Sequence, residues 1–151
     1  MKALRFALPA GLILAAVLTF PPAASGRIDP RDERIARVVS DCDARADEFQ
    51  RMFRRALDHS GYRGTMRQAD LDRHADALSH AMRRVREAWN RERDPRRTRR
   101  YVEEAIDVSR DINRVMNNNR FYPELHHRWD ALRHDLNRLA EEFELPRLRW
   151  D

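Results

Sequence analysis

The sequence predicts an all-α protein, an up-down-up-down four-helix bundle that follows a cleaved leader. Three observations support this fold class. Helix-start and helix-stop residues alternate along the chain, apolar residues recur at spacings of three and four, and no segment alternates as a strand does. The 151 residues include only four glycines and 36% charged residues, a composition typical of helices with charged outer faces.

The first 25 residues have the features of a secretory signal peptide. Lys2 and Arg5 precede an apolar run from Phe6 to Phe20, and the small residues Ala23-Ala24-Ser25 follow. The run is shorter than the roughly 20 apolar residues that a membrane-spanning helix needs, and it contains a proline and a glycine. We therefore expect cleavage after Ser25 and a periplasmic or secreted protein, with a retained N-terminal anchor as the alternative.

Residues 26–151 are predicted to form one helical domain with helices at about 30–60, 66–93, 95–117 and 123–144. Their starts are marked by an Asp-Pro pair, a capping box or a proline, all residues that satisfy or tolerate the free amides of a first turn. In chain order these starts are Asp29-Pro30, Thr65 to Gln68, Asp94-Pro95 and Pro123.

The expected helix ends are Gly61 and Gly64, then Asn117-Asn118-Asn119, then Leu145-Pro146. Gly and Asn are typical of helix ends because they tolerate the left-handed conformation found there. A fusion of the second and third helices into one long hairpin that dimerises is the alternative architecture. Pro95 argues against such a fusion, because a proline interrupts a helix interior.

An apolar stripe on each predicted helix is expected to face the core of the bundle. Its average spacing of 3.5 residues is that of left-handed bundles. The stripe residues are Ile35, Val39, Cys42, Ala46, Phe49, Phe53 and Ala56; Leu71, Ala75, Leu78, Met82, Val85 and Trp89; Tyr101, Ala105, Val108, Ile112 and Val115; and Leu125, Trp129, Leu132, Leu136, Leu139 and Phe143. Short connections then make neighbouring helices antiparallel.

Two stretches, "VVSDCDARADEFQRMFRRALDHSGYRGT" and "RWDALRHDLNRLAEEF", resemble parts of exported bacterial helical-bundle proteins of unknown function. The resemblance covers roughly residues 38–143, and its most specific parts are the turn after the first helix and the segment 129–140. Because most of these residues are expected in the core or in turns, the resemblance implies a fold and export and carries over no catalytic residue.

The single cysteine, Cys42, rules out a disulfide within the chain. It lies on the core stripe between Asp41 and Asp43, two charges that disfavour a thiolate. A redox thiol or a disulfide between chains is the alternative, but we expect a buried, unreactive side chain.

The six histidines fall toward one half of the expected bundle. His59, His126 and Asp130 would lie on adjacent helices and form a candidate surface site for a transition metal. They match no recognised ligand spacing, so we expect a solvated face and predict no metal. A haem site is also disfavoured, because the chain has no CxxCH motif and no histidine on a stripe to face Met82.

Nine arginines against three acids lie between Arg83 and Arg100, at the other end of the bundle. Arginine clusters hold phosphate, lipid headgroups or acidic glycans through paired hydrogen bonds. In the alternative interpretation, acids one helical turn away pair with these arginines, and the segment is a solvent-exposed helix junction that binds no partner. The predicted contacts to an anionic partner are Arg96, Arg97, Arg99 and Arg100.

The charge of the whole chain makes a nucleic-acid partner a poor candidate. Removal of the leader takes away two basic residues and lowers the net charge from +5 to +3, and export also separates the protein from nucleic acid.

The adjacent acids Glu103-Glu104 and Glu141-Glu142 point about 100° apart on a helix and form no catalytic pair.

We therefore expect an exported, non-enzymatic interaction module without a cofactor, either a monomer or a weak dimer. Its partner would be a protein or an anionic component of the envelope. A small metal or cofactor carrier and a chaperone-like accessory factor are the alternatives.

Overall fold

The computed structural model describes residues 29–149, which contain four α-helices and no strand. They are α1 (Pro30–Asp58), α2 (Met66–Glu92), α3 (Pro95–Asn118) and α4 (Pro123–Glu142). The predicted all-α class with four helices is confirmed for this part of the chain, and each helix end lies within two residues of its expected position. The predicted leader, residues 1–25, lies outside the described residues. None of the four described helices has the length and apolar composition needed to cross a membrane.

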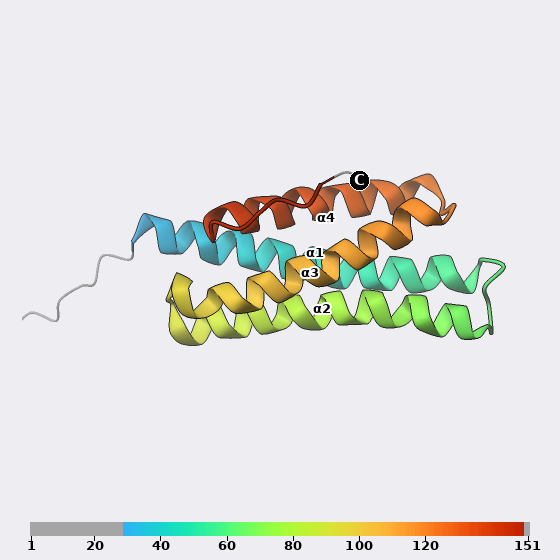
Figure 1. Cartoon of the computed structure of the whole chain (residues 1–151), viewed down its shortest axis with the longest axis horizontal. Helices are drawn as coiled ribbons and strands as arrows, with labels where there is room; N and C mark the ends of the chain where they lie inside the picture. The colour runs from blue at the N-terminus through green and yellow to red at the C-terminus, as the bar shows by residue number, and fades with distance from the viewer. Residues whose placement is uncertain (1–28, 150–151) are drawn as a thin grey trace, which may run out of the picture.

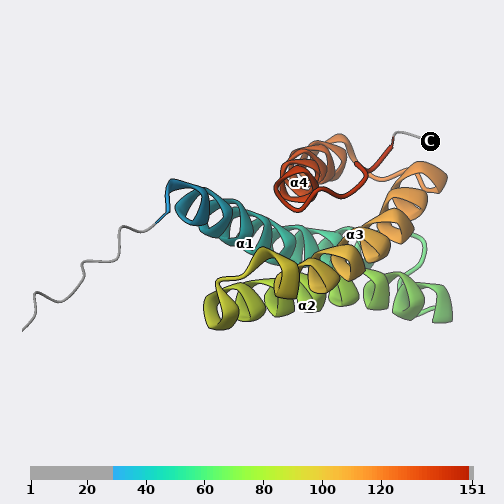
Figure 2. The same ribbon diagram turned by 60° about the vertical axis from the view of Figure 1, so that its left-hand side comes forward.

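Successive helices run in opposite directions, as the colours in Figure 1 show. The α2 helix packs along both α1 and α3, while α1 also packs along α4. The pair α3 and α4 makes the least direct contact of these neighbours. In Figure 2, α4 is seen nearly end-on while α2 is seen from the side, so α4 is inclined to α2.

Side chains from all four helices form one apolar core. Every residue that was predicted to face inward from α1, α2 and α4 is buried. Large side chains of α1 and α4 meet in this core, where the ring centroids of Phe49 and Trp129 lie 5.3 Å apart. The apolar stripes of these three helices are therefore confirmed.

The stripe predicted for α3 is wrong in part. Tyr101, Val108 and Val115 are only partly buried at the edge of the core. The buried face includes three polar residues, Thr98, Ser109 and Asn113, that a search for apolar residues passes over. Ser109 Oγ donates a hydrogen bond of 2.7 Å to the carbonyl of Ala105, four residues earlier. The rest of this face consists of Val102, Ala105, Ile106, Ile112 and Met116.

The predicted helix starts are formed by the expected caps, with one change of partner. Thr65 Oγ1 accepts a hydrogen bond of 3.2 Å from the amide of Gln68. Gln68 Oε1 does not return to the amide of Thr65, however, but accepts from the amide of Gly64 at 2.7 Å. The Thr65 amide instead donates to the carbonyl of Tyr62.

The helix ends use left-handed residues at positions other than the predicted asparagines. Asn119 is extended, with φ −127°, and its Nδ2 donates to the carbonyl of Val115 at 2.7 Å. Gly64 is left-handed as expected, but Arg93 and Glu144 also adopt φ values of 47° and 56°. The expectation of left-handed asparagines is therefore wrong, because an amide side chain can cap a carbonyl directly.

Candidate functional site

The turn between α2 and α3 lies at the same end of the molecule as the start of α1 and the end of α4 (Figure 1). Both α1 and α3 begin with the sequence Asp-Pro-Arg. Asp29 Oδ1 accepts from the amide of Arg31, and Asp94 Oδ1 accepts from the amide of Arg96, both at 2.8 Å. The two predicted Asp-Pro starts thus place an arginine in the first turn of two helices at one end of the bundle.

Much of the positive charge of the 83–100 segment is paired with acids from other helices. Arg86 Nη1 lies 2.6 Å from Asp43 Oδ2 of α1, and Arg84 Nη2 lies 2.5 Å from Glu104 Oε1 of α3. Arg83 contacts Asp47 of α1 at 3.8 Å. The local charge excess is therefore smaller than the segment alone indicates, because tertiary packing brings additional carboxylates to it.

Arg97 and Arg99, two of the four predicted contacts, are engaged within the protein. Arg97 pairs with Glu92 at 3.0 Å and with Asp94 at 3.6 Å. Arg99 pairs with Glu103 at 3.0 Å. Its guanidinium also donates to the carbonyls of Phe143 and Glu144, at 3.0 and 3.3 Å, so it caps the end of α4. Arg99 is thus a structural residue that connects α3 to α4.

The other two predicted contacts, Arg96 and Arg100, differ in their surroundings. Arg100 Nη2 donates to the Tyr101 hydroxyl at 2.6 Å, and its guanidinium lies 4.6 Å from the ring centroid. Within residues 29–149, the exposed side chain of Arg96 forms no hydrogen bond and no ion pair. Arg96 is therefore the predicted contact with the most freedom to bind a partner.

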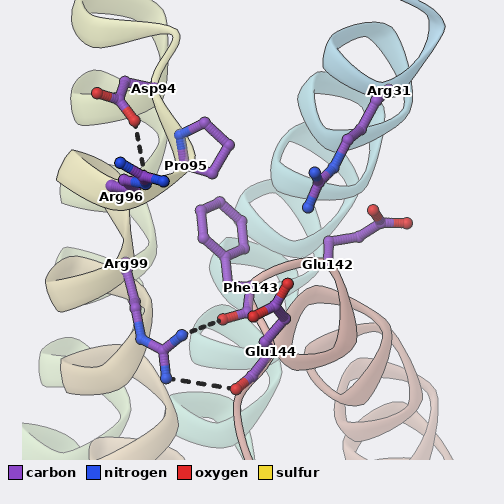
Figure 3. Close-up of a pocket in the computed structure, with 8 residues that line it drawn as sticks. All are labelled: Arg31, Asp94, Pro95, Arg96, Arg99, Glu142, Phe143 and Glu144. Carbon is purple, nitrogen blue, oxygen red and sulfur yellow. Dashed lines mark hydrogen bonds between the residues drawn. The ribbon is translucent and has the colours of Figure 1, made fainter.

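A cavity of about 410 Å³ lies beside Arg96, between the starts of α1 and α3 and the end of α4 (Figure 3). Arg31 contributes a second guanidinium that, within the described residues, has no acidic partner. The carboxylates of Asp94, Glu142 and Glu144 also line the cavity. Each helix start adds roughly half a positive charge from its free amides. This arrangement can hold an anionic group, in competition with its own acids.

The candidate ligand set of His59, His126 and Asp130 is not assembled among the described residues. His59 Nδ1 lies 2.7 Å from the carbonyl of Arg55, and Asp130 pairs with Arg133 at 3.0 Å. Among residues 29–149, no group of three or more His, Cys, Asp or Glu side chains is arranged to hold a metal ion.

Cys42 is fully buried on α1, as predicted. Burial raises the pKa of its thiol, and the nearby carboxylates of Asp135 and Asp41 raise it further. The neutral thiol is therefore the form that the core holds, and a neutral thiol is a poor nucleophile.

Sequence reasoning missed a set of buried polar side chains. Asp43 and Asp135 are both at most 4% exposed, and they pair with Arg86 and Arg45 across helix interfaces. Burial raises the pKa of Asp43, while Arg86 lowers it. Only the position of Asp43 beside the stripe residue Cys42 could have indicated burial, because an acid on a helix is normally exposed.

The comparisons with known proteins found no similarity: no protein-family model, no curated protein and no solved structure matches this chain.

Proposed function

We propose that the protein is an exported, non-enzymatic interaction module built as an up-down-up-down four-helix bundle. The opposite directions of successive helices support this topology (Figure 1). In this proposal the leader is removed after Ser25, and the mature chain works in the periplasm or outside the cell as a monomer or weak dimer. The charge pattern of residues 1–25 supports export, as does the resemblance to exported bacterial helical-bundle proteins.

The cavity at the arginine-rich end is the observation that carries the proposal. Arg31 and Arg96 each project from the first turn of a helix, and both line this cavity (Figure 3). Guanidinium groups bind carboxylates and phosphates through paired hydrogen bonds, and the two helix starts favour the same charge. The partner is therefore a protein or an envelope component that presents an anionic group, and no nucleic acid is involved.

The carboxylates in the same cavity limit the affinity and set the specificity. Glu142 is already paired with Arg34 at 2.7 Å, whereas Asp94 caps α3. A partner must approach without placing its own charge against these acids. Charged contacts of this kind contribute more to the association rate and to selectivity than to affinity.

The test is a capture experiment from envelope extract of the native host with immobilised mature chain. We expect that Arg96→Glu loses a partner that the wild-type chain captures. Arg73→Glu is the matched control, because Arg73 is an exposed arginine on α2 whose ion pair with Asp70 is local. Equal capture by both variants contradicts the assignment of this surface. Mass spectrometry of the same host's protein tests export, since we expect an N-terminus at Gly26.

A further inference from the structure

After α4 the chain reverses, and residues 145–149, here called the tail, run back along the bundle (Figures 1 and 2). Asn137 Oδ1 of α4 accepts from the amide of Leu148 at 2.7 Å, and Asn113 Nδ2 of α3 donates to the carbonyl of Arg149 at 3.5 Å. Leu148 is 4% exposed and belongs to the core. Arg147 and Arg149, on either side of it in the sequence, are exposed. The burial of one leucine therefore holds two guanidiniums at the surface beside α3.

The second half of α3 carries a stripe of residues whose side chains all donate hydrogen bonds. They recur at the spacings i, i+3, i+4, i+7 and i+8, which lie on one face of a helix. A cavity of about 600 Å³, here called the tail cavity, lies between this stripe and residues 146–149. Among the described residues, no acid lines it, whereas three acids line the cavity beside Arg96. The stripe consists of Arg110, Asn113, Arg114, Asn117 and Asn118.

Asn113 is the buried member of this stripe. It is 7% exposed, and its Oδ1 accepts from Trp129 Nε1 at 3.1 Å and from Arg133 Nη1 at 3.5 Å. Both partners can only donate, so they orient the amide with Nδ2 toward the tail. The contact of Nδ2 with the carbonyl of Arg149, at 3.5 Å, is long for a hydrogen bond. This amide can therefore donate to a ligand in the tail cavity.

Four guanidiniums line the tail cavity, and three of them pair with acids that lie outside its lining. Arg110 and Arg114 each donate from Nη1 to the aspartate three residues earlier in α3. Arg147 Nη2 lies 2.5 Å from Glu141 Oε1. Exposed pairs of this kind contribute little to stability, and one contact leaves most of the five N–H groups of a guanidinium unused. Within residues 29–149, the side chain of Arg149 forms no hydrogen bond and no ion pair.

The hydrogen-bond donors, more than the net charge, determine what fits the tail cavity. The three paired acids offset three of the guanidiniums, and the carbonyls at the end of α3 oppose an anion by a fraction of a charge. The donors come from two sides, α3 and the tail. A carboxylate offers two oxygens in one plane, whereas a phosphate group offers three or four in a tetrahedron, which guanidiniums on two sides can bind in pairs. The lining therefore suits a phosphate group better than a carboxylate.

The geometry points to a phosphate site: we propose that the tail cavity binds the phosphate group of a small organic phosphate or of a phospholipid headgroup. Its volume of about 600 Å³ falls within the range of roughly 300–1,000 Å³ that is typical of small-ligand pockets, so an organic group attached to the phosphate also fits. The inference is independent of the anionic contact at Arg96, because the two cavities share no lining residue.

The experiment is a titration of the ¹⁵N-labelled full chain with glycerol phosphate, followed by two-dimensional NMR. The amide signals of residues 110–118 and 147–149 report on the tail cavity, while those of Arg31 and Arg96 report on the other cavity. One titration therefore measures the two sites separately. We expect saturable shifts at the tail cavity, and at least tenfold weaker binding of acetate there.

Charge-reversal variants make the test specific. Arg149→Glu and Arg114→Glu, one on each side of the tail cavity, should each weaken the binding of glycerol phosphate at least tenfold. The Leu148 amide signal shows whether the tail stays docked in these variants. Arg63→Glu is the matched control, because Arg63 is exposed and its side chain also has no hydrogen bond or ion pair within residues 29–149. The control changes the net charge equally and should leave binding unchanged.

Co-sedimentation with vesicles distinguishes the two sources of the phosphate. Vesicles of equal parts phosphatidylcholine and phosphatidylglycerol are the probe. Sedimentation that Arg149→Glu abolishes and Arg63→Glu preserves identifies a lipid headgroup, whereas NMR shifts without sedimentation identify a soluble phosphate. The proposal is overturned if neither probe binds in a way that depends on Arg149. Acetate binding as tight as that of glycerol phosphate, or an equal loss in Arg63→Glu, overturns it as well.

Discussion

The indole of Trp129 is hydrogen-bonded to the side-chain amide of Asn113, with 3.1 Å between Nε1 of α4 and Oδ1 of α3. Both residues are buried, and the Trp129 ring also packs on Phe49 of α1. One side chain of α4 thus contacts both α1 and α3, in agreement with the prediction that Trp129 faces the core.

We predict that Trp129→Ala lowers the free energy of unfolding by about 3–5 kcal/mol, since it removes a buried aromatic and leaves a cavity. It also removes the shorter of two hydrogen bonds to Asn113 Oδ1, which keeps the bond of 3.5 Å from Arg133 Nη1. His127→Ala is the control, because His127 is exposed on the same helix. Urea unfolding followed by circular dichroism measures both variants. Equal midpoints for the two would contradict the assigned core.

Asp43→Asn should change how stability depends on pH. Burial raises the pKa of Asp43 in the folded protein even though Arg86 opposes this, and Oδ1 has no hydrogen-bond partner among the described residues. An acid with a raised folded pKa destabilises the fold above that pKa, and the penalty disappears as the pH falls below the unfolded value of about 3.9.

The wild type should therefore be no more stable than Asp43→Asn at pH 7, and any advantage of the variant should shrink on acidification. The free energies of unfolding of both proteins are measured at several pH values between 7 and 3 and subtracted. Because the other acids titrate in both proteins, their contribution cancels in the difference. An advantage of the variant that grows as the pH falls would show that Asp43 is stabilised in its charged form.

Cys42 should be inert in the folded protein. Its thiol is 0% exposed, and burial together with Asp135 and Asp41 raises its pKa. A thiol reagent at pH 8 should therefore react only as fast as the chain unfolds, and the rate should rise with urea. Complete labelling within seconds in native buffer would place the thiol at the surface.

Glu144→Gly should stabilise the protein by up to about 1 kcal/mol. The left-handed conformation at φ 56° costs an L-residue about 1–2 kcal/mol, which glycine avoids. Glycine loses more conformational freedom on folding, however, so the net gain in stability is only part of this amount. Ala77→Gly, at an exposed position inside α2, is the opposite control and should lose about 1 kcal/mol. Thermal unfolding compares them, and a destabilised Glu144→Gly would show that the carboxylate has a role of its own.

Local signals were enough to locate the helices and most of the core. Asp94-Pro95 starts α3 because the cap and the fixed φ of proline act within two residues, so no distant contact is needed. The error in α3 has a specific cause. Asn113 is buried because its amide bonds to Trp129, a partner 16 residues away whose position depends on the packing of α4.

The candidate site was predictable only as a cluster of arginines. The sequence showed that Arg99 lies in a basic segment, but only the fold brings its guanidinium to the carbonyls of Phe143 and Glu144. The fold also distinguishes Arg96 from its neighbours, because the Arg96 side chain forms no hydrogen bond and no ion pair within residues 29–149.

The sequence by itself determined the helical class, the four helices and the residues that start them, because these depend on periodicity and on contacts within one turn. The tertiary structure decided which arginines are neutralised, where buried acids such as Asp43 find partners, and where residues 145–149 dock. Those outcomes depend on which face of each helix meets its neighbour and in which register, and the charges and amides involved come from residues far apart in the chain.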